Sequence, residues 1–283
     1  MKILVLNAGS SSHKLSLFDL NDDVSLTEPL WKGEIDWGRK GESPSVTFST
    51  SKGHHAAKSV NVGEGIEVLL NSLWEGEERV IDGPKDIERI GHRVVHGGGE
   101  LIKPVLINNQ VKKAIRKVIP LAPLHNPANL EGIERMEKLF PHIPQVAVFD
   151  TAFHATMPEF VKTYPVPLKW KELGVQRYGF HGISHHYCTE RAAALLKMEP
   201  AALKMINCHL GNGASLCAIK GGKSFDTTMG LTPLEGVMMG SRCGSIDPGI
   251  LLYLMREHQM TLHELDDALN FASGLKGIGG HSD

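Results

Sequence analysis

One arrangement occurs twice in this chain: an apolar segment, a turn of small polar residues and a second apolar segment. The first copy is ILVLNAGSSSHKLSL at residues 3–17, and the second is INCHLGNGASLCAI at residues 206–219. Each copy predicts two strands joined by a tight turn. The two copies share few identical residues, so the shared pattern points to an internal duplication without establishing one.

The two turns also carry a functional prediction. Small residues let backbone N–H groups approach a phosphate closely, and hydroxyl groups add hydrogen-bond donors. Tight hairpins use the same residues for steric reasons alone, which is the alternative. Other phosphate motifs are incomplete: GKS at 222–224 has Cys217 where a P-loop needs its first glycine, and no GxGxxG occurs in GNGASL or GIGGHS. Two turns in equivalent places favour nucleotide binding.

The order of the predicted elements indicates two domains. Several strands (2–7, 15–20, 30–36, 45–50) precede a helical pattern at 62–74, and helices at 111–119 and after His125 then lead to a strand at 145–150. Asn126 is the predicted cap of the second of those helices. This order describes one α/β domain over 1–150. A second domain over 151–283 follows, and 283 residues are enough for both.

The second half begins with a predicted helix at 184–198, with Ser184 near its cap. Further helices are expected after the Asp–Pro pair at 247–248 and after Thr261, which forms a capping box with Glu264. The segment GLKGIGGHSD at the end is expected to be a glycine-rich loop, and His54 and His55 a solvated loop.

Composition excludes several classes of function. The net charge is −2, so there is no basic field for nucleic acid or an anionic membrane. No segment approaches the about 18 apolar residues of a membrane helix, and the apolar run at the N-terminus is too short for the central region of a signal peptide. The four cysteines lie singly, which argues against a zinc ribbon or disulfide framework. We therefore expect a cytoplasmic protein without a membrane or nucleic-acid partner.

Two arginines and one aspartate lie at positions in the sequence where a charged side chain suggests a ligand or a charged partner. Arg93 lies in an apolar strand, so it faces a ligand or, alternatively, an ion-pair partner. Arg242 lies between Gly240 and Gly244 in a loop, and both guanidinium groups suit a planar carboxylate or a phosphoryl group. Asp150 ends a strand, where functional carboxylates are common, although a turn cap is an equal alternative.

His181 can donate a hydrogen bond or positive charge to a reacting group. It could also join His185 and His186 in a transition-metal site, but no HExxH motif occurs, so we favour the first interpretation.

Six segments resemble the successive signatures of the acetate kinase family, whose sister enzymes are the propionate kinases. In chain order they are NAGSSSHK, HRVVHGG, FDTAFH, YGFHGISH, HLGNGAS and MGSRCGSIDP, and they extend over essentially all 283 residues. The resemblance implies the α/β class with a duplicated actin-like ATPase (ribonuclease H-like) fold of two domains, the second incomplete. It also implies a homodimer.

The resemblance implies a role for each matching residue. The substrate-binding positions are the carboxylate-holding Arg93 and the acyl-pocket residues Val95, Leu124, Phe180 and Pro233. The catalytic positions are Asp150, His181 and Arg242. The nucleotide positions are Lys14, the loop residues His209, Leu210, Gly211, Asn212 and Gly213, and the adenosine-contacting Asp283. The metal position, for Mg²⁺, is Asn7.

The implied activity is reversible, in-line transfer of the γ-phosphoryl group of ATP to acetate. Members of the family are longer, and the remainder would carry an adenosine-binding loop, a glutamate of the magnesium site and a terminal helix. An alternative is therefore a catalytically incompetent remnant. Another is a propionate kinase, because one methylene changes discrimination by only about 1–3 kcal/mol.

Overall fold

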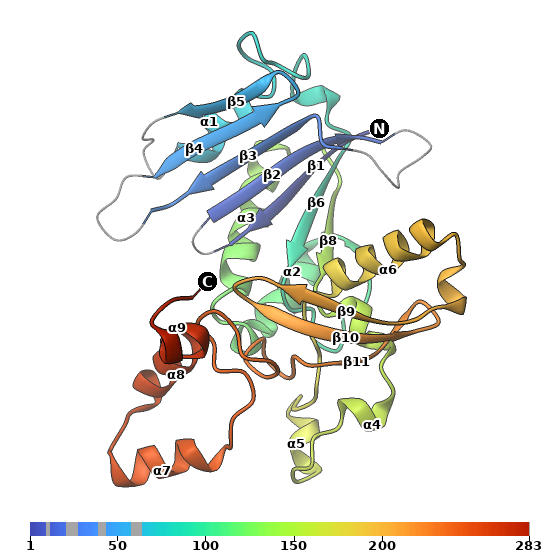
Figure 1. The fold of residues 1–283 in the computed structure, drawn as a ribbon. Coiled ribbons are helices and arrows are strands. Elements are labelled where there is room, and N and C mark those ends of the chain that lie inside the picture. Colours follow the sequence, from blue (N-terminus) through green and yellow to red (C-terminus); the bar gives the residue numbers. More distant parts are fainter. Residues whose placement is uncertain (10–11, 21–27, 39–43, 58–63, 283) are drawn as a thin grey trace. The chain divides into compact units, whose positions relative to one another are not determined.

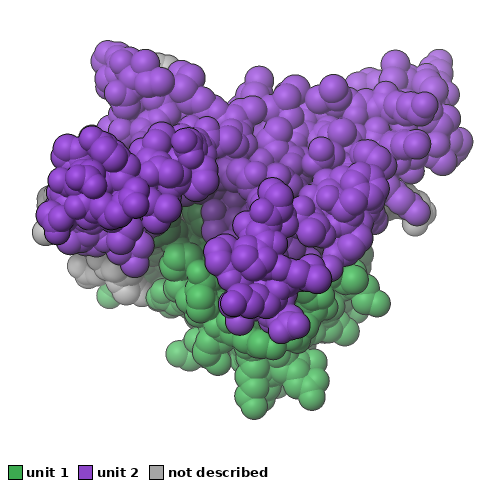
Figure 2. Space-filling model, turned by 90° about the horizontal axis from the view of Figure 1, so that it is seen from below, with its two compact units in different colours: residues 1–149 green, residues 150–283 purple. Residues whose placement is uncertain are grey.

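The computed structural model describes residues 1–9, 12–20, 28–38, 44–57 and 64–282. The chain divides into two compact units, Met1–Phe149 and Asp150–Asp283, which Figure 2 colours separately. The division falls beside the boundary expected from the sequence, and it places Asp150 at the start of the second unit.

In the described part of unit 1, eight strands form one sheet in the order β5-β4-β3-β2-β1-β6-β8-β7 (Figure 1). The strands are β1 (Lys2–Ala8), β2 (Ser12–Asp19), β3 (Trp31–Asp36), β4 (Ser45–Thr50), β5 (Gly53–Ala57), β6 (Arg89–Val94), β7 (Val105–Leu106) and β8 (Gln145–Phe149). Strands β1 to β5 form an antiparallel meander. Strand β6 runs parallel to both β1 and β8, so the carboxyl ends of these three strands lie at one edge.

Two helices cover one face of this sheet, α1 (Gly65–Asn71) and α3 (Asn126–Leu139). Alternate residues of β1 are buried beneath them, as the period of a half-buried strand requires. Arg135 of α3 donates to Glu67 of α1 at 2.6 and 2.8 Å, which ties the helices together. Gly132 lets α3 approach β1, because a Cβ there would lie 2.8 Å from the Cβ of Ala8.

Unit 1 has three further helical elements among its described residues. They are α2 (Asn109–Lys117) and the 3₁₀ turns η2 (Pro84–Asp86) and η3 (Ile119–Leu121). The side chain of Asn108 caps α2 by accepting hydrogen bonds from the backbone N–H groups of Gln110 and Val111.

Unit 2 contains the second predicted hairpin. Strands β9 (Lys204–Leu210), β10 (Ala214–Lys220) and β11 (Lys223–Thr227) form an antiparallel sheet in the order β11-β10-β9. Helix α6 (Gly182–Leu196) packs against β9 (Figure 1). The other elements are η4 (Ala152–Thr156), α4 (Glu159–Lys162), α5 (Lys169–Glu172), η5 (Pro200–Ala202), α7 (Gly249–Glu257), α8 (Leu262–Phe271) and α9 (Gly274–Gly279).

Most of the expected elements form. Both hairpins exist, as β1–β2 and β9–β10, although Ser10 and Ser11 of the first turn lie outside the described residues. The capping box of Thr261 and Glu264 at the start of α8 is confirmed. No helix among the described residues is long and apolar enough to cross a membrane.

Two local expectations were wrong. His54 and His55 lie in β5, where pairing with β4 and stacking of His55 on Phe48, with ring centroids 5.0 Å apart, outweigh their polarity. Residues 274–279 form α9 despite their glycines, because Met239 and Gly240 accept hydrogen bonds from the start of this helix. The N-cap of α6 is His181, and Ser184 lies near this cap in the first turn of the helix, as expected.

Acid should destabilise the fold through its buried histidines. Burial lowers the pKa of His92 in unit 1 and of His154 in unit 2 to about 4. The unfolded chain binds these protons near pH 6.5, so stability is full above that pH and falls between pH 6.5 and 4. The loss is roughly 1.4 kcal/mol per pH unit for each histidine. Urea unfolding at a series of pH values measures it.

His92→Gln should reduce the slope of the unfolding free energy against pH by up to the contribution of one proton, since glutamine does not titrate. His142→Gln, which changes an exposed histidine, is the matched control. An unchanged slope in His92→Gln would show that His92 is protonated equally in both states.

Candidate functional site

In unit 1 a polar cluster lies where β1 and β6 end. Arg93 Nη1 donates to Asn7 Oδ1 at 3.1 Å, so the structure brings these two predicted residues together. Lys14 pairs with Asn7 across the β1–β2 ladder, and its half-exposed ammonium lies 3.3 Å from Glu34 Oε1. The carboxyl ends of parallel strands are where α/β sheets place their ligands.

The loop after β6 is held by two buried asparagines of α3. Asn129 accepts from the backbone N–H of Val95 at 3.0 Å and donates to the carbonyl of Ala8 at 2.6 Å. Asn126 accepts from the N–H of His96 and donates to its carbonyl, both at 3.0 Å. The N-cap of α3 is His125, so the capping role expected of Asn126 was wrong. Sequence reasoning missed Asn129, whose signal was its i, i+3 spacing from Asn126 on one helix face.

The four predicted acyl-pocket residues are divided between the units. Val95 in unit 1 is buried and Leu124 is 38% exposed. Phe180 in unit 2 is buried, and Pro233 is half-buried. Their joint role therefore remains a prediction.

In unit 2 two cationic or hydrogen-bonding side chains converge on the turn between β9 and β10. A Cβ placed on Gly213 would lie 3.3 Å from Arg242 Nη1 and 3.5 Å from His181 Nε2. Glycine at this position therefore leaves space in front of both nitrogens. Arg242 Nη1 donates to the carbonyl of Pro233 at 2.9 Å. Burial lowers the pKa of Arg242, but a guanidinium remains charged in proteins.

The rest of the predicted loop surrounds this point. Leu210 ends β9 with 76% of its surface exposed. The carbonyl of Asn212 accepts from the N–H of Gly240 at 3.1 Å, which ties the turn to the segment carrying Arg242. Gly211 lies in the same turn, and Asp283 lies outside the described residues.

His181 is held in an unusual backbone conformation. Its φ and ψ are 58° and 20°, the left-handed region that costs a non-glycine residue about 1–3 kcal/mol. Its ring stacks on His209, with centroids 4.0 Å apart and planes at 23°. Its Nδ1 lies 2.9 Å from Ser215 Oγ. Backbone strain of this kind gathers at functional sites, which supports the predicted role of His181.

The neighbouring histidines are used for hydrogen bonding. His154 Nδ1 and Nε2 contact Ser224 Oγ and the carbonyl of Phe180, at 2.8 and 2.9 Å. His186 stacks on Phe153, with centroids 5.2 Å apart. No cluster of three or more His, Cys, Asp or Glu side chains suited to a metal occurs in the part of the chain that the structure describes.

Asp150 is buried, with 2% of its surface exposed. Its backbone carbonyl accepts from the N–H of Gly182 at 2.8 Å, so it fixes the start of α6. Its negative charge also favours the protonated form of His154, against the larger effect of burial.

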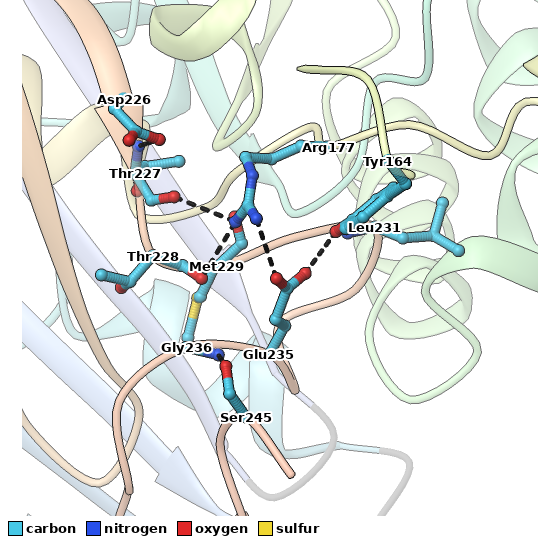
Figure 3. A network of polar contacts seen from close by, with 10 residues as sticks. All are labelled: Tyr164, Arg177, Asp226, Thr227, Thr228, Met229, Leu231, Glu235, Gly236 and Ser245. Carbon is cyan, nitrogen blue, oxygen red and sulfur yellow. Dashed lines mark hydrogen bonds and ion pairs between the residues drawn. The ribbon is translucent and has the colours of Figure 1, made fainter. Parts of the chain in front are cut away.

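A polar network, which sequence reasoning missed, supports the segment that carries Pro233 and Arg242 (Figure 3). Arg177 donates to the carbonyls of Thr227, Thr228 and Met229 at 3.0–3.1 Å and to Glu235 Oε1 at 2.8 Å. Tyr164 donates to the second carboxylate oxygen of Glu235 and accepts from the N–H of Leu231 at 2.9 Å. Of these residues, Arg177, Thr227, Thr228 and Glu235 line part of a cavity of about 550 Å³.

Comparison with known proteins places these features in a family. The model of the Acetokinase family matches residues 2–283. The chain is 56% identical to an acetate kinase of Protochlamydia amoebophila and 54% identical to one of Microcystis aeruginosa, in each case over all of this chain and 71% of the relative.

Solved structures give the same relationship. A propionate kinase of Francisella tularensis matches with a TM-score of 0.90 and 41% identity, and an acetate kinase of Porphyromonas gingivalis with 0.88 and 39%. Both comparisons cover all of this chain and 71% of the other.

Glu235→Ala should destabilise unit 2 because it removes the carboxylate to which the part-buried Arg177 and Tyr164 both donate. We expect a loss of about 2–3 kcal/mol in the free energy of unfolding, measured by urea denaturation. Hydrogen exchange should also increase in residues 228–245. The matched control is Glu257→Ala, which removes an exposed glutamate of α7. Equal stability of the two variants would contradict the supporting role of the network.

Proposed function

The chain belongs to the acetokinase family, and from that premise we propose that it catalyses reversible transfer of the γ-phosphoryl group of ATP to acetate, giving acetyl phosphate and ADP. The observation that carries the proposal is the convergence of His181 Nε2 and Arg242 Nη1 on Gly213, in the turn that bears the HLGNG motif. The acetate kinases that share 54–56% of its residues support the same activity.

Acetate, which accepts the phosphoryl group, needs to be positioned more than it needs to be activated. A carboxylate is ionised at pH 7, so it attacks phosphorus without a general base. Arg93 presents a planar guanidinium that suits two carboxylate oxygens, and its bond to Asn7 fixes one edge of that group. We assign Val95, Leu124, Phe180 and Pro233 to the methyl group of acetate.

The transfer step needs donors for the oxygens of the moving phosphoryl group. Its transition state spreads negative charge over three equatorial oxygens, and preorganised donors stabilise that charge. Arg242 supplies a charged N–H and His181 a second donor on the same side of the Gly213 turn. Their positions are fixed by Pro233 and Ser215 respectively, so little reorganisation accompanies the reaction.

Asp150 takes an orienting role in this proposal. Its backbone already fixes the start of α6 and hence His181. An ionised nucleophile leaves no proton for Asp150 to abstract, so we assign its side chain to holding neighbouring cationic groups or the magnesium shell in place.

ATP would be held by the backbone of residues 209–213, where small residues admit a phosphate, and by the charge of Lys14. Asp283 is assigned to the adenosine on the family resemblance alone.

Magnesium fits the residues only in part. Asn7 offers an amide oxygen, a ligand of the type magnesium takes, but this oxygen already accepts from Arg93. Magnesium usually binds through one or two protein oxygens together with substrate phosphates and water. Asn7 is the protein ligand we propose, and the ion when bound supplies charge that neutralises the phosphate oxygens.

We also propose that the protein is a cytoplasmic homodimer. Light scattering would measure its mass in solution.

Arginine variants test the activity. Acetyl phosphate made from acetate and ATP is trapped with hydroxylamine and measured as the hydroxamate. Arg242→Ala should lower kcat by about 10²–10³-fold, because a transition-state donor is lost. Arg93→Ala should mainly raise the KM for acetate. The control is Arg256→Ala, which changes an exposed arginine of α7 and should leave both constants unaltered. Absence of hydroxamate from the unaltered protein would refute the proposal.

The ratio of kcat/KM for acetate to that for propionate tests the acyl substrate. We expect acetate to be preferred by about 10–200-fold, because one methylene group changes substrate discrimination only modestly. A preference for propionate would overturn the choice of acid and leave the phosphotransferase activity standing.

A further inference from the structure

Four polar side chains form a continuous chain of hydrogen bonds in unit 2. Asn207 of β9 donates from Nδ2 to His185 Nδ1 at 3.0 Å. His185 Nε2 lies 2.8 Å from Ser215 Oγ of β10. The same Oγ lies 2.9 Å from Nδ1 of His181, at the start of α6. His185 and Ser215 have no exposed surface, so water does not compete for these bonds.

The amide at one end sets the direction of every bond. An amide NH₂ group only donates, so His185 Nδ1 accepts, and a neutral imidazole then carries its single proton on Nε2. That proton is donated to Ser215 Oγ. Among the described residues the two imidazole rings are the partners of this hydroxyl. Its hydrogen therefore points to His181 Nδ1, since leaving it unused in a buried site would cost about 1–3 kcal/mol.

We propose that Asn207, His185 and Ser215 are positioning residues that hold His181 as the neutral tautomer with its proton on Nε2. This nitrogen faces Gly213 beside Arg242 Nη1, so the tautomer presents an N–H donor there. For its role in catalysis the inference rests on the proposed phosphoryl transfer, in which the N–H would donate to a phosphoryl oxygen.

The electrostatic surroundings keep both imidazole rings of this hydrogen-bond chain neutral. Among the described residues, the titratable or charged groups around the two rings include His154, His209 and Arg242. Burial, together with the neighbouring His154 and His209, lowers the pKa of His185 to about 3. A cationic His185, which would carry protons on both nitrogens, is therefore absent near neutral pH. The donor on His181 then does not depend on pH in the neutral and alkaline range.

Asn207→Asp should reverse the direction of every hydrogen bond in this series, because aspartate has almost the same shape as asparagine but only accepts hydrogen bonds. A carboxylate only accepts, so His185 places its proton on Nδ1 and accepts from Ser215 through Nε2. His181 must then donate from Nδ1 to Ser215, which leaves Nε2 as an acceptor facing the phosphoryl oxygens. Protonation of either ring restores a donor at Nε2 of His181, so the variant should recover activity as the pH falls.

The first measurement is kcat between pH 6 and 9. Asn207→Asp should lose about 10–100-fold at pH 8.5, less than a fully removed donor, and regain most of it at pH 6, with the acetate KM unchanged. Asn109→Asp, which adds the same charge on the exposed start of α2, should behave like the unaltered protein. An equal loss at every pH would point to a merely structural role and overturn the inference.

The second measurement reads the tautomer without using activity. Ring ¹⁵N NMR distinguishes protonated from unprotonated nitrogens, and His181→Gln assigns the signal of His181. We expect the proton on Nε2 of both His181 and His185 in the unaltered protein, and on Nδ1 in Asn207→Asp. A proton on Nδ1 of His181 in the unaltered protein would overturn the inference even if the enzyme is active. If the protein makes no acetyl phosphate, the proposed function fails, and the NMR result still decides the tautomer.

Discussion

The close contact between Gly182 and Asp150 governs the arrangement of unit 2. The Gly182 N–H donates to the Asp150 carbonyl at 2.8 Å, and a Cβ on Gly182 would lie 2.2 Å from that oxygen. Only glycine permits this approach, so α6 must begin directly against the residue that follows β8. His181 is consequently forced into the left-handed region, and its ring is directed to Ser215 and His209. The backbone strain at His181 is thus supported by packing around the next residue.

Features encoded by neighbouring residues could be predicted from the sequence. The apolar run of β1, the amphipathic face of α1 and the capping box of α8 each depend on residues close together in the sequence. Arg93 was identified because a charge in an apolar strand requires a partner, and the structure provides Asn7. The shared role of His181 and Arg242 came only from the family resemblance, because they lie too far apart in the chain for any local sequence pattern to connect them.

Features that depend on distant partners could not be predicted. Asn129 reaches the carbonyl of Ala8 through a separation of 121 residues, and Arg177 meets Glu235 across 58. Each of these polar residues looks unremarkable among its sequence neighbours. Helix α9 shows the same limit in another form, because acceptors on Met239 and Gly240 outweigh the low helix propensity of its glycines. The sequence contains these residues but not the contacts that give them their roles.

The two hydrogen-bond donors near Gly213 differ in charge: Arg242 is cationic, and in our proposal His181 is neutral. Arg242 is partly desolvated, which lowers its pKa, yet a guanidinium keeps its proton throughout the physiological range. It therefore supplies charge. An imidazolium beside that charge would be repelled, and the buried histidines around His181 would add to the repulsion if they were protonated. A neutral N–H avoids this penalty and still offers a directional hydrogen bond. Hydrogen bonds to neutral donors are weaker than those to charged ones, so the arrangement gains orientation and independence from pH at the expense of strength.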